Sequence, residues 1–239
     1  MSAPWWRAIA ADWVKLRKTW ITFLVFLGPF GVILVNTLRF TLGYKWLIQQ
    51  PDKWGAVMNS VNVVLIPTLV LGIAVLASMM NSIEYQGHMW KQFLVLPVPR
   101  YVLYLSKFFW LIAFLAVSAT LAVVGTWLLG LGLGLPRQIP WALILKDGFY
   151  PYLASYGIIA FQLLLSTLFN SQVYALIAGV VGFIASTTTL LPKWVPWVYP
   201  AIASPVSPHY SAVFVLYGIG FGVLVVNVGL LVFQRQEIK

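Results

Sequence analysis

Six long apolar runs set the strongest limit on what this chain can fold into. They cover residues 20–38, 58–80, 102–135, 150–169, 172–191 and 211–233. A helix needs roughly 20 mostly apolar residues to cross the hydrocarbon core of a membrane, and inside lipid the backbone must satisfy its own hydrogen bonds. The runs therefore predict an all-α integral membrane protein with six transmembrane helices.

Only Asn170, Ser171 and Gln172 separate the fourth run from the fifth. Such a short linker favours a tight helical hairpin, and one long bent helix, which would leave five spans, is the alternative. The third run is longer than one crossing requires. This length indicates a tilted helix or one that extends past the membrane.

Composition and charge exclude other classes of protein. With 61% hydrophobic and 8% charged residues and a mean hydropathy of +0.90, the 239 residues leave no room for a separate soluble domain. We expect one transmembrane domain over residues 1–239. The net charge of +10 is spread between apolar runs, so it favours anionic lipid headgroups as partners and not nucleic acid. There is no Cys, hence no disulfide and no thiolate nucleophile.

The N-terminal segment, residues 5–19, has the pattern of a helix that lies in the membrane surface. Its apolar stripe at helical spacing consists of Trp5, Ile9, Trp13 and Leu16, continued by Trp20. Its basic residues are Arg7, Lys15, Arg17 and Lys18. The alternative is that these residues only flank the first span as anchors. No short apolar core with a small-residue cleavage site is present, so we expect no removable signal peptide.

Topology follows from the basic residues. The flank before the first span is strongly basic, and with this flank inside, the inner segments hold more Lys and Arg than the outer ones. The positive-inside rule then predicts that both termini are cytoplasmic. Residues 192–210 lie outside in this topology. Five prolines break this stretch and its Trp and Tyr residues suit the interface, so we expect a re-entrant or interfacial segment.

Titratable residues give little support to catalysis or to ion coupling. The acidic residues are Asp12, Asp52, Glu84, Asp147 and Glu237, and the predicted spans place all of them at helix ends or in loops. Ion-coupled carriers commonly hold an ionisable group deep in the bundle, so this placement argues against a carrier. The two histidines, His88 and His209, fall on opposite sides, which argues against a metal site or an acid/base pair.

The segment of residues 81–107 is too amphipathic to span a membrane and too apolar for a free loop. Glu84 and His88 are four residues apart and can share a helical face, and Trp90 can seat the segment on lipid or on neighbouring helices. We expect a rigid cytoplasmic elbow over residues 81–100 that receives force from a soluble partner. The candidate contact residues are Glu84, Gly87, His88, Trp90, Lys91 and Arg100.

The elbow resembles the cytoplasmic loop of type-2 ATP-binding-cassette exporter permeases. The matching residues are Glu84, Gly87, Trp90-Lys91, Pro97-Val98-Pro99-Arg100 and Ser106-Lys107. The match is specific over about 25 residues in the sequence, and the turn reads Pro-Val-Pro-Arg where the family has Pro-Val-Ser-Arg. The closest similarity is to the permeases of lantibiotic immunity and bacitracin efflux. Most of the chain shares the family layout: an interfacial helix, six spans and a broken outer segment.

The resemblance implies a coupling helix near residues 81–93 that docks, with the N-terminal helix, on a nucleotide-binding subunit. Independently, the chain contains no Gly-Lys dipeptide and hence no phosphate-binding loop. We therefore expect no cofactor and no enzymatic activity in this chain, with ATP and Mg²⁺ bound by a partner ATPase. A second permease chain, identical or similar, is the other expected partner.

Polar residues inside the spans are candidates for a substrate path: Asn36, Asn62, Gln162 and Asn227. The alternative is that such groups hydrogen-bond neighbouring helices to one another. Two small-residue spacings, Gly130 with Gly134 and Gly218 with Gly222, allow close helix approach and are weak evidence for a dimer.

The function that these observations favour is an ATP-driven exporter permease in a bacterial plasma membrane. Its basic and aromatic outer mouth suits an amphipathic antimicrobial peptide or a lipid-like compound. The alternatives are a non-transporting sensor or assembly subunit and, with less support, an ion-coupled carrier.

Overall fold

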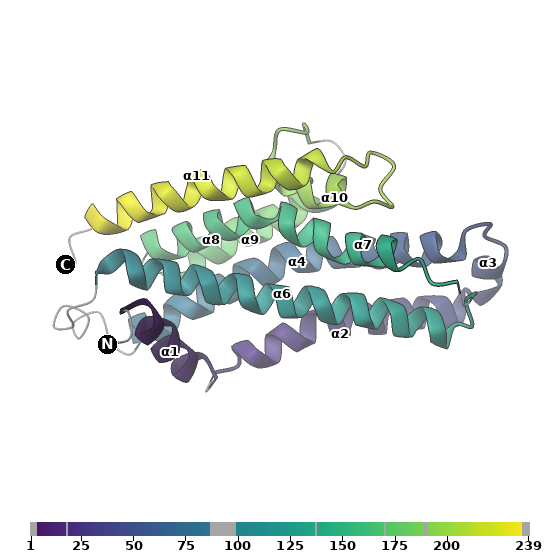
Figure 1. Ribbon diagram of the computed structural model, residues 1–239, viewed down its shortest axis with the longest axis horizontal. Helices are drawn as coiled ribbons and strands as arrows, with labels where there is room; N and C mark the ends of the chain where they lie inside the picture. Colours follow the sequence, from purple (N-terminus) through teal and green to yellow (C-terminus); the bar gives the residue numbers. More distant parts are fainter. Residues whose placement is uncertain are drawn as a thin grey trace.

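A computed structural model describes residues 4–17, 19–86, 99–136, 138–169, 171–188 and 191–235. Within these ranges the chain forms helices joined by short turns, and none of the described residues is in a strand. The long helices run side by side in one elongated bundle, with α1 (Pro4–Leu16) lying across one end of it (Figure 1). The all-helical prediction is confirmed.

Five stretches are long and apolar enough to cross a membrane. They are α2 (Ile21–Leu42), α4 (Lys53–Gln86), α6 (Arg100–Gly132), the pair α7 (Trp141–Ala154) and α8 (Tyr156–Leu168), and α11 (Val213–Arg235). The apolar window in the α7 and α8 stretch is 67% buried, against 28% in α2 and 22% in α11. The α7 and α8 stretch is therefore central, and α2 and α11 expose apolar faces suited to lipid or to a partner chain. The chain is a multi-pass membrane protein.

The sixth predicted span is a shorter helix. α9 (Gln172–Thr187) has 16 mostly apolar residues, and it is too short for a full perpendicular crossing. α8 and α9 are separate helices that pack together, as the hairpin prediction requires. The described residues therefore contain five helical stretches long enough to span a membrane, and the count of six spans stays a prediction.

Two boundaries differ from the prediction. α4 continues to Gln86, so residues 81–86, which we assigned to the coupling segment, are the last turns of the second span. The fourth span begins near Trp141 and not at residue 150. It is interrupted at Ser155, whose backbone N–H bonds the carbonyl of Pro151 at 3.1 Å. Both helices extend further than predicted because the fold buries polar residues in these segments, where they hydrogen-bond to other helices.

The segment before the last span is broken, as its prolines predict. After α9 come a 3-10 turn, η1 (Pro196–Val198), and the short helix α10 (Tyr199–Ala203), which packs against α7 and α11. A second short helix, α3 (Tyr44–Ile48), links α2 to α4 at the end of the bundle away from α1 (Figure 1).

Two glycines determine where α11 packs in the bundle. A side chain at Gly218 would collide with the backbone of Ala154, and one at Gly222 would press on the backbone of Tyr156. The Gly218 and Gly222 pair therefore seats α11 on the junction of α7 and α8. Gly134 lies beyond α6 with a φ of +69°, so Gly130 and Gly134 do not form one helical face. Neither pair is evidence for a dimer.

Candidate functional site

The N-terminal helix α1 is fastened to the bundle chiefly through α6. Its Ile9 and Leu16 are buried, and the indole N–H of Trp110 donates a hydrogen bond of 3.0 Å to the carbonyl oxygen of Ile9. The rings of Trp13 and Trp110 stack with centroids 4.9 Å apart and an interplanar angle of 18°. The predicted helix exists, and one face of it packs on protein.

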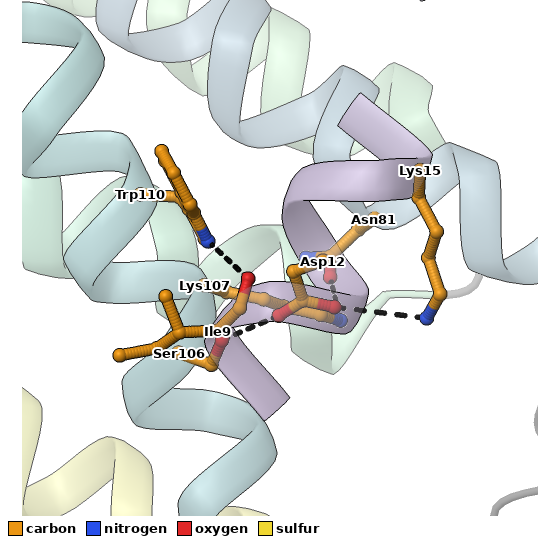
Figure 2. Close-up of polar contacts among 7 residues, drawn as sticks. All are labelled: Ile9, Asp12, Lys15, Asn81, Ser106, Lys107 and Trp110. Carbon is orange, nitrogen blue, oxygen red and sulfur yellow. Dashed lines mark hydrogen bonds and ion pairs between the residues drawn. The ribbon is translucent and has the colours of Figure 1, made fainter. Parts of the chain in front are cut away.

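A buried carboxylate lies on that packed face. Asp12 is 7% exposed, and its Oδ2 accepts a hydrogen bond of 2.5 Å from the hydroxyl of Ser106 in α6 (Figure 2). Lys15, one turn further along α1, places its ammonium 3.6 Å from the other carboxylate oxygen. Our expectation that Asp12 sits at a helix end or in a loop is wrong, because it lies inside α1 with its charge compensated.

The next residue of α6 continues the polar contacts into two further helices. Lys107 is 4% exposed and donates 2.6 Å to the side-chain oxygen of Asn81 in α4. The amide nitrogen of Asn81 donates 2.5 Å to the hydroxyl of Ser166 in α8. Figure 2 shows Asp12, Ser106, Lys107 and Asn81 together. Since Ser106 and Lys107 are consecutive, and Asn81 also bonds Ser166, polar contacts join α1, α4, α6 and α8 at one end of the bundle. We call Asp12, Asn81, Ser106, Lys107 and Ser166 the polar junction.

Buried charges of this kind are stable only when they are paired and hydrogen-bonded. The Asp12 carboxylate accepts from Ser106 and faces Lys15, the Lys107 ammonium donates to Asn81, and Asn81 in turn donates to Ser166. Removing one partner would leave another buried polar group unsatisfied. The junction therefore holds α1 and the ends of three bundle helices in one fixed arrangement.

The candidate coupling residues flank this junction in sequence. Glu84 is in the last turn of α4, three residues after Asn81, and Arg100 is the first residue of α6. Their side chains lie outside the described set. Gly87, His88, Trp90 and Lys91 lie outside the described residues altogether, so their predicted roles stay predictions.

The interfacial candidates on α1 divide into two groups. Ile9 is buried, Trp5 is partly buried, and Trp13 is 39% exposed although it stacks on Trp110. Lys15 faces Asp12, and Arg17 follows the helix and is exposed. Lys18 lies outside the described residues.

The four pathway candidates are not brought together. Asn36 of α2 accepts a hydrogen bond of 2.8 Å from Ser60 of α4, and Gln162 of α8 donates to the carbonyl of Ala175 in α9. Asn227 is exposed and donates within its own helix to Val223 at 2.8 Å. The contacts of Asn36 and Gln162 match the alternative we weighed, hydrogen bonds between neighbouring helices, whereas that of Asn227 stays within α11. Asn62 is the exception and has a different setting.

Asn62 contacts a buried carboxylate that sequence reasoning placed in a loop. Its amide nitrogen donates 2.6 Å to Oδ1 of Asp147 in α7 and 2.8 Å to the hydroxyl of Ser204, which itself donates 2.9 Å to the same carboxylate oxygen. Asp147 is 4% exposed inside the fourth candidate span. The expectation that no carboxylate lies within a span is therefore wrong.

Comparison with known proteins gives one result. A family model described as ABC-2 family transporter protein matches residues 8–186, well over half of the chain. The match begins in α1 and ends in α9, so it contains the whole polar junction. Neither a search of curated proteins nor a search of solved structures found a match.

Proposed function

Because this chain belongs to the ABC-2 family of transporter proteins, we propose that it is the membrane-spanning permease subunit of an ATP-driven exporter. The observation that carries the proposal is the polar junction. It fixes α1 to α4, α6 and α8 near the end of α4 and the beginning of α6, the two points that residues 87–98 connect in the sequence. A subunit that docks on α1 and on that segment would push on several bundle helices at once.

ATP is hydrolysed by a partner subunit in this proposal. The chain has no Gly-Lys dipeptide, and the described residues contain no group of three or more acidic, His or Cys side chains that would hold a metal ion. The partners are a nucleotide-binding ATPase and a second permease chain, which is identical or similar. α1 and the C-terminal end of α11 lie at the same end of the bundle, in keeping with both termini in the cytoplasm of a bacterial cell (Figure 1).

An apolar cavity supports an amphipathic peptide or a lipid-like compound as the substrate. It has a volume of about 410 Å³ and lies between α2, α4, α6 and α7. Its walls include Leu24, Leu69, Leu115 and Tyr152, and the polar share of the lining is small. Such a cavity suits an acyl chain or an apolar side chain better than a small ion. Lantibiotic and bacitracin-type compounds are the narrower candidates that the elbow favours.

Co-purification tests the proposal. We solubilise the tagged chain gently from its native membrane and expect an ATPase subunit in fixed stoichiometry. Glu84→Ala and Trp90→Ala, changed together, are expected to lose that subunit. Trp46→Ala is the matched control, because Trp46 is 50% exposed in α3 at the opposite end. A chain that always elutes alone, under conditions that preserve other membrane complexes, would refute the exporter.

Coupling has a second readout. In the assembled complex we expect Glu84→Ala or Gly87→Pro to abolish stimulation of the ATPase by substrate while the chain still inserts. Normal stimulation in both variants would contradict the coupling role. For a sensor or assembly subunit, efflux of the substrate from cells would survive deletion of this chain.

The buried Asp147 favours one alternative, an ion-coupled carrier, because such carriers place a carboxylate inside the bundle. Reconstitution separates the two mechanisms. Uptake that needs ATP and the partner subunit supports the exporter, whereas uptake by the chain alone that collapses with the proton or sodium gradient supports the carrier.

A further inference from the structure

A second cavity lies beside Asp147 in the half of the bundle away from α1. Its volume is about 300 Å³, and it is lined by residues of α4, the end of α9, and α10 with the residues that follow it. Half of the lining residues are amides and hydroxyls: Asn59, Asn62, Ser186, Thr187, Ser204 and Ser207. Two of them, Asn62 and Ser204, hydrogen-bond the carboxylate of Asp147, which therefore stands directly behind the cavity wall.

No positive charge compensates this carboxylate among the residues that the structure describes. The ion pair of Asp12 and Lys15 lies in α1, away from this site. Lys146, the neighbour of Asp147 in sequence, is exposed while Asp147 is buried. Two hydrogen bonds stabilise the anion only in part, because a buried charge also needs an opposite charge nearby.

One buried acceptor at the site lacks a partner. The amide nitrogen of Asn62 faces Asp147 and Ser204, and this orientation is forced because an ionised carboxylate cannot donate a hydrogen bond to the amide oxygen. The oxygen is left buried without a hydrogen-bond partner.

The site thus has one negative charge behind its wall, one unpartnered oxygen acceptor, and a lining that is half polar and half apolar. A divalent metal ion would prefer more than one carboxylate among its oxygen ligands, and a cavity of about 300 Å³ is the size that holds an organic group. An ammonium or guanidinium group supplies the two features that the site lacks, a positive charge and N–H donors.

We propose that this cavity binds a cationic amino or guanidino group through the Asp147 charge, with Asn62 and Ser204 at its wall. The group would be part of the exported compound, and this assignment rests on the proposed function. In the proposed topology the cavity is in the outer half of the membrane. A compound that places its cationic head there and its apolar tail along the bundle would be a cationic amphiphile.

Binding of a defined probe tests the site. We reconstitute the full chain in nanodiscs of neutral lipid and measure fluorescence anisotropy of monodansylcadaverine, a primary ammonium attached to an apolar fluorophore. Its N-acetylated form is the matched neutral probe. We expect the ammonium probe to bind at least tenfold more tightly than the acetylated one, because acetylation removes the positive charge that the Asp147 carboxylate attracts. Equal binding of the two probes would overturn the proposal.

Variants locate the binding. Asp147→Asn keeps the shape of the side chain and should weaken the ammonium probe roughly tenfold to a hundredfold with little effect on the acetylated one. Ala201→Phe should block the cavity without touching the carboxylate. Asp52→Asn, in an exposed turn, is the control and should change nothing. Wild-type binding in both Asp147→Asn and Ala201→Phe would overturn the site. The two-probe comparison uses the unchanged chain, so it decides even if a variant fails to fold.

The measurement also separates this site from the exporter. Ammonium-selective binding by a chain that never recovers an ATPase would retain the site and refute the exporter. Absence of selective binding in a chain that does recover the ATPase would refute the site alone.

Discussion

Replacing Asp12 by Ala should release α1 from the bundle to a measurable degree. The change removes the acceptor of the Ser106 hydroxyl, 2.5 Å away, and the partner of Lys15. A hydrogen bond to a charged group contributes about 1.5–3 kcal/mol, and a partly exposed ion pair adds about 0–1 kcal/mol. Docking of α1 should therefore weaken by about 2–3 kcal/mol, a shift of roughly 30- to 150-fold in its equilibrium.

Thiol labelling measures that shift directly. The chain has no Cys, so Ala8→Cys introduces a single thiol on the packed face of α1, where Ala8 is 8% exposed. When docking and undocking are fast, the rate of labelling follows the undocked fraction. We expect labelling to rise by roughly 30- to 150-fold in the Asp12→Ala background. α1 should still dock in most molecules, because Ile9 and the stacked Trp13 remain.

Two controls sharpen the result. Asp12→Asn retains an oxygen that accepts from Ser106 but removes the charge. Its labelling rate should therefore lie between those of the parent and of Asp12→Ala. Asp52→Ala removes an exposed carboxylate that caps Gly55 at the other end of the bundle and should leave the rate unchanged. If Asp12→Ala labels within about twofold of the parent, docking of α1 does not depend on the polar junction and the reasoning fails.

Two other substitutions test packing within the bundle. Gly218→Ala should separate α11 from the α7 and α8 junction and lower the thermal stability of the purified chain, because the new methyl meets the backbone of Ala154. Gly220→Ala is the control and should leave the thermal stability unchanged, because its methyl meets nothing within 4 Å. Gln162→Leu should lower the free energy of unfolding by about 1–3 kcal/mol, since the carbonyl of Ala175 in α9 loses a buried donor; the matched change Asn227→Leu, on an exposed helix face, should leave thermal unfolding in detergent unchanged.

The all-helical membrane fold could be predicted because it depends on local composition. Each long apolar run became a helix, and the prolines of residues 192–210 divided that segment as expected. The start of the fourth span was wrong for a physical reason. Lys146 and Asp147 lower the hydropathy of residues 141–149, whereas the fold buries Asp147 against Asn62 and Ser204, which are 85 and 57 residues away.

The polar junction could not be predicted for the same reason. Asp12 and Ser106 are 94 residues apart, and Asn81 and Ser166 are 85 apart. No periodicity within one segment reports a partner at that separation. One signal was available: an acidic residue in the middle of an amphipathic helix requires a partner when the helix packs on protein. Asp12 met that description, and the Ser106-Lys107 pair was already noted in the resemblance.

α4 is the element that belongs to both polar clusters, through Asn81 in the polar junction and Asn62 beside Asp147. The two residues are 19 positions apart on one helix, about 28 Å at 1.5 Å per residue. In the proposed exporter, a displacement of α1 and of the adjoining end of α4 has two routes to the far cavity. Either the whole helix shifts and the Asn62 hydrogen bond to Asp147 breaks, or the helix bends at Pro67, where the backbone donor of an intrahelical hydrogen bond is missing. Because Pro67 itself lines that cavity, both routes change the volume beside the buried carboxylate.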